Sequence, residues 1–243
     1  MSGELVRREE VGEVVGRLTE GDLDRAERGR LLVRLTALLA GGARAAGARA
    51  ALTGTWLTSV VADVALHIPV RDLATLSGHH DGHTGDALAE ELVRTASLAT
   101  AGVGAAGGAL AAVQLAAPPT LLAAPVQLAA ETVAVVAIEL KLVAELHVVY
   151  GKAPLAPKGQ VAAAYLSAWA AKRGIDPAAG LPGLGVVLGT AARQQLRRRV
   201  VRRLGRNLST MAPFLAGAVA GAELNRRETR SLGESLIGEL RRR

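Results

Sequence analysis

Apolar residues recur with a helical period along most of the chain. Ranges 4–18 and 22–40 place hydrophobic residues three and four positions apart, with charges of both signs between them, which is the pattern of amphipathic helices. Gly21, Gly41 and Gly42 follow these two ranges and are expected to end the helices. Because no run of alternating β-branched and polar residues extends beyond a few positions, the sequence predicts an all-α fold.

The region after the second helix is predicted to hold an Ala-rich helix and a polar loop. Range 43–66 is expected to be helical and to end before Pro69, whose ring disfavours helix at the residue before it. A short segment, 71–76, leads into a polar loop over 77–85. Asp86 is then predicted to be the N-cap of the next helix, because its carboxylate can accept bonds from the free N–H groups there.

The centre of the chain is its most apolar part. No charged residue and no histidine occurs from Thr95 to Ala130. Range 95–117 is long enough to span a bilayer core, but it consists mainly of Ala and Gly, so its transfer into lipid is expected to be marginal. A helical hairpin that bends at Pro118 and Pro119 fits both a buried core and a segment inserted in a membrane.

Four more helices complete the pattern, over 126–150, 160–173, 186–211 and 213–240. We therefore expect a single helical bundle-like domain with an Ala/Gly-packed central helical hairpin. Within it we distinguish an N-terminal amphipathic helical segment, 1–42, from an Ala/Gly-rich helical core domain with basic C-terminal helices, 43–243.

Composition indicates how these helices pack. Half of the 243 residues are hydrophobic but only 2% are aromatic, so the core consists of small aliphatic side chains and requires close approach of backbones. Two Gly-x-x-x-Gly pairs, Gly104 with Gly108 and Gly217 with Gly221, place small residues on one helix face and are candidate packing sites. The chain holds 28 Gly, a frequency at which some such pairs arise by chance.

A polar stripe is predicted on the helix over 126–150. At 100° per residue its members fall within an arc of about 80°; they are Gln127, Glu131, Lys141 and Glu145. Lys141 and Glu145 are spaced to form an ion pair, whereas a buried Glu131 needs a cation, a donor or water. Pairing with an arginine of another helix, such as Arg94, explains the stripe, and a proton or ion relay is the alternative.

The polar loop offers the one candidate metal site. His79, His80 and His83, with Asp81 between them, could supply ligands to a divalent metal. Their spacing matches no metalloenzyme signature, and polar residues gather in loops for other reasons. We assign no metal and keep the three histidines as weak candidates, which would serve a metal-dependent hydrolase. The rest of the sequence shows no catalytic motif and indicates no cofactor, which favours a protein without catalytic activity.

Positive charge is concentrated near the C-terminus. The formal net charge is +7, and range 193–243 alone contains thirteen Arg and four Glu. One face of the helix predicted there carries Arg198, Arg199, Arg202, Arg203 and Arg206. Such a face attracts anionic lipid headgroups or an acidic protein partner, and a solvated outer face is the alternative. The lack of interleaved aromatics and of a known module argues against nucleic acid.

Several glycine-rich segments resemble the EcsC-type family. They are the run 102–112 with the proline break after it, the helix end at Tyr150-Gly151, and the closing run 213–221 with Asn225. The resemblance covers about 86–243 and implies a helical protein; the founding member of that family is associated with a transporter operon. The chain departs at Ala117-Pro118-Pro119, where that family tends to have an acidic residue before the proline. The whole chain also looks similar to proteins of high-GC actinobacteria.

The sequence favours a location in the cytoplasm or at the cytoplasmic face of a membrane. The chain has no Cys, which excludes disulfides and thiolate metal sites, and we see no secretory signal at its start. We expect an α-helical, membrane-associated accessory or interaction protein, peripheral or inserted, whose partner is an anionic membrane surface or a helical protein. A soluble helical protein-interaction module is the main alternative, and the metal-dependent hydrolase is less favoured. The sequence does not determine the oligomeric state.

Overall fold

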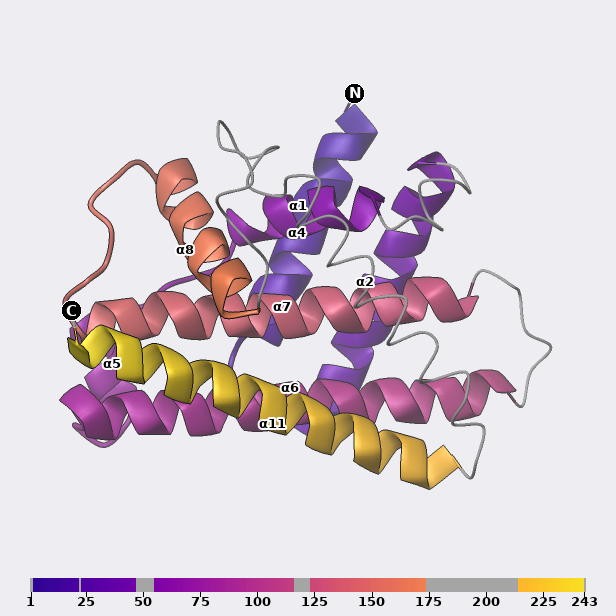
Figure 1. Cartoon of the computed structure of the whole chain (residues 1–243). Coiled ribbons are helices and arrows are strands. Elements are labelled where there is room, and N and C mark those ends of the chain that lie inside the picture. The colour runs from indigo at the N-terminus through magenta and orange to yellow at the C-terminus, as the bar shows by residue number, and fades with distance from the viewer. Residues whose placement is uncertain (1, 22, 47–54, 116–122, 174–213, 243) are drawn as a thin grey trace.

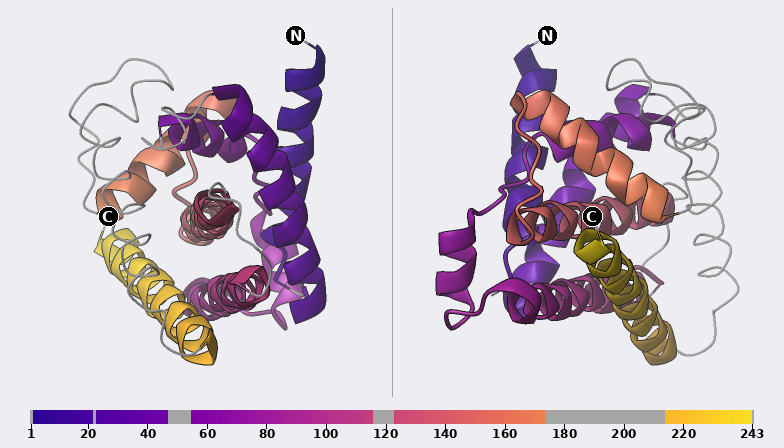
Figure 2. Two further views of the ribbon diagram at one scale, coloured as in Figure 1. Left: turned by 90° about the vertical axis from the view of Figure 1, so that its right-hand side faces the viewer. Right: turned by 60° about the vertical axis from the view of Figure 1, so that its left-hand side comes forward.

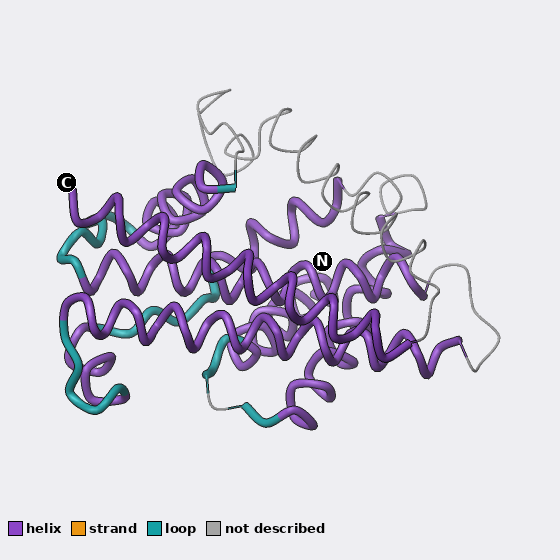
Figure 3. The backbone as a smooth tube through the Cα atoms, turned by 60° about the horizontal axis from the view of Figure 1, so that its bottom comes forward, coloured by secondary structure: helices purple, strands orange, loops and turns teal. Residues whose placement is uncertain are grey.

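A computed structural model describes residues 2–21, 23–46, 55–115, 123–173 and 214–242. Every regular element within these ranges is an α-helix, which confirms the predicted all-α class. The helices are α1 (Ser2–Leu18), α2 (Arg25–Ala46), α4 (Thr55–Ala65), α5 (Leu73–His79), α6 (Gly85–Leu115), α7 (Ala123–Val149), α8 (Lys158–Lys172) and α11 (Phe214–Arg242). Short loops join neighbouring helices within the described ranges (Figure 3).

Three long helices, α6, α7 and α11, run side by side along the molecule (Figure 1). α6 and α7 follow each other in the chain and form an antiparallel hairpin, the central hairpin expected from the sequence. α11 lies antiparallel along α6, so that Asn225 contacts Thr100 and Gly233 lies next to Val93.

α7 is the central helix of the bundle. α1, α2, α4, α6, α8 and α11 all pack against it, and Figure 2 shows it enclosed by them. Every residue from Val126 to Leu146 is buried. A helix that is apolar on nearly every side has no face suited to water, and the surrounding helices bury all of it.

The N-terminal segment 1–42 contributes to the same core as the rest of the chain. In α1, Val11, Val14, Val15 and Leu18 repeat at the spacing of one helix face, and all four are buried. Leu32 and Leu35 of α2 are also fully buried in this core. Each such leucine contributes about 1.5–3 kcal/mol through the removal of its side chain from water.

Several helix ends differ from the prediction. α2 runs through Gly41 and Gly42 to Ala46, because packing of its apolar face outweighs the weak helix preference of two glycines. α7 begins at Ala123 and holds Pro125 in its first turn, where the missing N–H of proline breaks no helical hydrogen bond. The helix predicted over 186–211 and the bend at Pro118 and Pro119 lie outside the described residues.

The segment before α6 also differs from the prediction. The range expected to be a loop contains the end of α5, which reaches His79 and is capped at its start by Asp72; the Asp72 carboxylate accepts a bond from the Thr75 N–H at 2.8 Å. α6 begins at Gly85, one residue before the predicted N-cap. Asp86 therefore lies inside the first turn of α6, and the prediction that it caps the helix is wrong.

In the part of the chain that the structure describes, none of the helices has both the length and the apolarity required to cross a membrane. This search includes the described residues of α6 and α7, the two helices of the central hairpin.

Candidate functional site: the polar contacts of the central helix

The four residues of the predicted stripe are all buried on α7. Their residue exposures are 4% for Gln127, 6% for Glu131, 7% for Lys141 and 3% for Glu145. Buried polar groups are costly unless each finds a partner, so the contacts of these residues decide what they do.

Gln127 and Glu131, the two stripe residues nearer the start of α7, lie against the backbone of α6. Gln127 donates from Nε2 to the carbonyl oxygen of Gly107 at 2.7 Å and to Oε1 of Glu131 at 3.1 Å. The Glu131 carboxylate occupies the space that a side chain at position 107 would need. Gly107 is therefore required for this contact, since any Cβ there would overlap the carboxylate.

Glu145, the stripe residue nearest the end of α7, is bound by Arg71, which precedes α5. Arg71 donates from Nε to Oε1 of Glu145 at 2.8 Å and from Nη2 to Oε2 at 3.0 Å, a two-pronged ion pair. Lys141 Nζ lies 4.0 Å from the same Oε1. The suggestion that Arg94 supplies the cation is wrong, because Arg94 bonds to Glu91 on its own helix at 2.8 Å.

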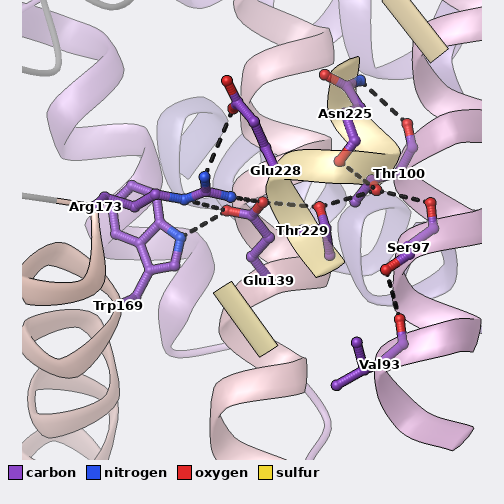
Figure 4. Close-up of polar contacts among 9 residues, drawn as sticks. All are labelled: Val93, Ser97, Thr100, Glu139, Trp169, Arg173, Asn225, Glu228 and Thr229. Atoms are coloured by element: carbon purple, nitrogen blue, oxygen red, sulfur yellow. Dashed lines mark hydrogen bonds and ion pairs between the residues drawn. The ribbon is translucent and has the colours of Figure 1, made fainter. Parts of the chain in front are cut away.

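Glu139 is the polar residue of α7 that sequence reasoning missed. It is only 2% exposed and accepts four hydrogen bonds, two on each carboxylate oxygen. Trp169 Nε1 and Arg173 Nε donate to Oε2 at 2.8 and 3.2 Å; Thr229 Oγ1 donates to Oε1 at 2.9 Å, and Arg173 Nη2 donates to the same oxygen (Figure 4). A carboxylate has about four acceptor sites, so Glu139 has none left for a substrate.

The position of Glu139 explains why it was missed. It lies about 120° around the helix from Gln127 and so falls outside the single polar arc. One signal was available, because a helix with charged residues on two different sides and apolar residues elsewhere must receive partners from more than one neighbouring helix.

Hydroxyl groups extend the Glu139 contacts from α11 to α6. The Thr100 hydroxyl lies 3.0 Å from the Thr229 hydroxyl oxygen, 3.1 Å from the Ser97 carbonyl and 3.4 Å from the Asn225 carbonyl; its one proton can serve one of these acceptors at a time (Figure 4). Asn225 returns a bond from Nδ2 to the Thr100 carbonyl at 3.1 Å. α7, α8, α11 and α6 are thus joined by one continuous set of buried hydrogen bonds.

Two of the four candidate packing glycines meet where α6 crosses α11. A Cβ placed at Gly104 would lie 2.9 Å from Ala222 N and from the Gly221 carbonyl carbon. Gly233 contributes a further close approach to Val93, which the Gly-x-x-x-Gly spacing did not predict. Gly108 lies within α6 and Gly217 within α11, and their surroundings are outside the described part of the structure.

Asp86, the predicted N-cap, instead joins the ends of three helices. Tyr150, just after α7, donates its hydroxyl to Asp86 Oδ1 at 2.6 Å, and Arg241 of α11 donates from Nε at 2.9 Å. The bond from Tyr150, and next in size the bond from Arg241, hold the pKa of Asp86 below its usual value. Burial, together with the bond to Asp86, raises the pKa of Tyr150.

The three candidate histidines do not form a metal site. Among the described residues, no group of three or more His, Asp or Glu side chains is placed to hold a metal ion. His79 Nδ1 lies 3.3 Å from Arg71 Nη1, and His83 is exposed. The Nε2 atom of His80 is buried without a hydrogen-bond partner, and burial, with Arg71 as the next cause, lowers the pKa of that ring.

The five arginines of the predicted basic face, Arg198, Arg199, Arg202, Arg203 and Arg206, lie outside the described residues.

Comparison with known proteins finds no match: no family model fits the chain, and no curated protein and no solved structure is similar to it. The described polar contacts of α7 join it to other helices and loops of this chain, so their role is to stabilise the fold.

Proposed function

We propose that the protein is a non-catalytic helical accessory protein that associates peripherally with the anionic cytoplasmic face of a membrane. The observation that carries this proposal is the distribution of charge. Seven arginines occur between Arg193 and Arg206, and no acidic residue occurs between Asp176 and Glu223. This basic segment, defined as residues 193–206, holds positive charge that no acidic neighbour in the sequence balances.

The arginines of the described C-terminal helix support this assignment by contrast. Arg226 and Arg227 both bond to Glu223, and Arg230 bonds to Glu234. At the end of the helix Arg241 bonds to Asp86. Because acidic side chains neutralise these arginines within the fold, the basic segment is the part of the chain best suited to bind an external anion.

The expected strength of such binding is sufficient for reversible attachment. Each arginine near an anionic bilayer contributes about 1 kcal/mol, and the attraction weakens as salt shortens the Debye length. Several arginines acting together therefore give binding that high salt reverses, without any inserted helix. The resemblance to the EcsC-type family is in keeping with an accessory role, since its founding member is associated with a transporter operon.

The absence of a catalytic role is part of the proposal. Among the residues described, the carboxylates of Glu139 and Glu145 are held by donors from other helices. A general base needs a free lone pair within reach of substrate, and the described bonds occupy those of Glu139.

Fractionation of cells that express the full chain tests the proposal. Membranes are washed with high salt, then carbonate, then detergent, and the protein is followed by immunoblot. We expect release by salt. Release only by detergent would show an inserted protein and overturn the peripheral assignment. Recovery in the soluble fraction before any wash would also overturn it and would favour the helical protein-interaction module.

Vesicle sedimentation with matched variants locates the binding surface. The test variant replaces Arg198, Arg199 and Arg202 by Gln, and the control replaces Arg226, Arg227 and Arg230 by Gln, so that both lose three positive charges. With vesicles that contain phosphatidylglycerol, we expect the test variant to lose most of its binding and the control to keep it. Equal loss in both variants would show a response to net charge alone and would contradict the assignment to the basic segment.

A further inference from the structure

An apolar groove of about 340 Å³ lies between α4, α7, α8 and the loop that follows α4. Leu140 and Ala144 of α7 form its floor, and both are buried. Val161, Ala162 and Tyr165 of α8 form one wall, and Ile68 belongs to the opposite wall. The groove is at the lower end of the range of about 300–1,000 Å³ that is typical of small-molecule sites.

Small residues and a fixed aromatic ring create the groove. Ala144 and Ala162 have side chains too short to fill the space between α7 and α8. Tyr165 is held beside it by the His147 ring, with the two ring centroids 5.4 Å apart. The groove reaches the surface at Pro69 and Val70, which are exposed.

Among the described residues that line the groove, Lys158 is the one that carries a charge. It is exposed and makes no hydrogen bond or ion pair within the described part of the chain. The other three lysines are engaged: Lys141 with Glu145, Lys152 with the Leu240 carbonyl and Lys172 with Glu239. The groove thus combines an apolar interior with a free ammonium group, and none of its described lining residues is acidic.

We propose that this groove binds a fatty acid, with the aliphatic chain between α7 and α8 and the carboxylate at Lys158. The apolar lining matches a hydrocarbon chain and provides no specific partner for a polar ligand body. The free ammonium complements a carboxylate and disfavours a cationic head. The described residues that line the groove belong to α4, α7, α8 and the loop after α4, so the site does not depend on membrane binding by the basic segment.

Calorimetric titration of the full-length protein with dodecanoate, below its critical micelle concentration, tests the site. We expect saturable binding of one molecule per chain. Affinity should rise about fourfold for each CH₂ added from octanoate to decanoate, because each methylene leaves water for the groove. Dodecanol and dodecyltrimethylammonium, with the same tail, should bind more weakly. Equal binding of either one would overturn the assignment of the carboxylate to Lys158.

Two charge-reversal variants test whether the carboxylate of the ligand lies at Lys158. Lys158→Glu reverses the charge at an exposed position and should weaken dodecanoate binding about tenfold. Arg34→Glu makes the same charge change at an exposed position on α2, away from the groove, and should leave the affinity unchanged. Unchanged affinity in Lys158→Glu, or an equal loss in both variants, would overturn the proposal.

Filling the groove tests the position of the aliphatic chain of the fatty acid independently of charge. Ala162→Leu adds three carbons to the wall and should abolish binding while circular dichroism shows an intact fold. If this variant unfolds, Val70→Asp at the exposed rim replaces it and should weaken binding strongly. Retention of full dodecanoate affinity in a folded groove variant would place the ligand elsewhere and refute the site, as would the absence of saturable binding to the unmodified protein.

Discussion

The indole Nε1 of Trp169 donates to the carboxylate of Glu139 across a distance of 2.8 Å. This bond joins α8 to the central helix at a position where both side chains are buried. The same carboxylate binds Arg173 and Thr229, so one residue of α7 orders both α8 and α11. Glu139 is in this sense the polar centre of the bundle.

Loss of this carboxylate should strongly destabilise the fold. Glu139→Ala leaves the donors of Trp169 and Arg173 without their acceptor, and breaking a buried ion pair costs about 3–5 kcal/mol. We expect the lower end of this range, because Arg173 would keep a second acidic partner: its Nη1 also lies 3.6 Å from Glu228. Urea unfolding followed by circular dichroism measures the change. Glu234→Ala, which removes an exposed pair with Arg230, is the control and should cost less than about 0.5 kcal/mol. A similar loss in both variants would mean that the Glu139 contacts do not stabilise the bundle.

A methyl group at position 104 should separate α6 from α11. The Cβ of Gly104→Ala would lie 2.9 Å from backbone atoms of Gly221 and Ala222, and backbone cannot move aside as a side chain can. We expect a cost of about 1–3 kcal/mol in the free energy of unfolding. Gly29→Ala in α2, with open space around it, should be neutral or stabilise by up to about 1 kcal/mol. If Gly104→Ala were as stable as Gly29→Ala, the close crossing of the two helices would be refuted.

The contribution of Asp86 to stability should depend on pH. Its bonds to Tyr150 and Arg241 lower the pKa in the folded state, so the ionised carboxylate stabilises the fold above its unfolded pKa of about 4. This stabilisation is lost as the pH falls through the lowered value. The wild type should therefore exceed Asp86→Asn in stability at pH 7, and the difference should shrink as the pH is lowered below about 4. Thermal unfolding at a series of pH values measures it. A difference that is constant over this range would contradict a pKa shift at Asp86.

Arg71 and Glu145 should be energetically coupled to a greater degree than a surface pair of the same chemistry. The side chain of Glu145 is 4% exposed and receives two bonds from Arg71. A double-mutant cycle with Arg71→Leu and Glu145→Leu should give a coupling energy of about 2–3 kcal/mol. The cycle for Arg94 and Glu91 is the matched control, since that pair is also two-pronged but more exposed, and it should give less than about 1 kcal/mol. Equal couplings would show that burial does not strengthen the Arg71 contact.

Local patterns were sufficient to predict most of the helices but not all of their ends. The spacing of apolar residues predicted α1 correctly. Gly151, with a φ of +65°, ends α7 close to the predicted position. Gly41 and Gly42 did not stop α2, and Pro125 did not delay α7. In α2, tertiary packing outweighed a local preference of about 1 kcal/mol per glycine. In α7, Pro125 lies in the first turn, where proline breaks no helical hydrogen bond.

The sequence by itself determined the helical class, the central apolar hairpin and the four polar residues on α7, because periodicity and charge are properties of neighbours along the chain. Only the tertiary structure decided that Arg71 rather than Arg94 binds Glu145, and that Glu139 receives donors from α8 and α11. It also brought Lys158 to the mouth of a groove built by residues as distant in the chain as Ile68 and Tyr165. Such pairings depend on how helices pack in three dimensions, and the spacing of residues along one helix does not specify which side chain of another helix will face it.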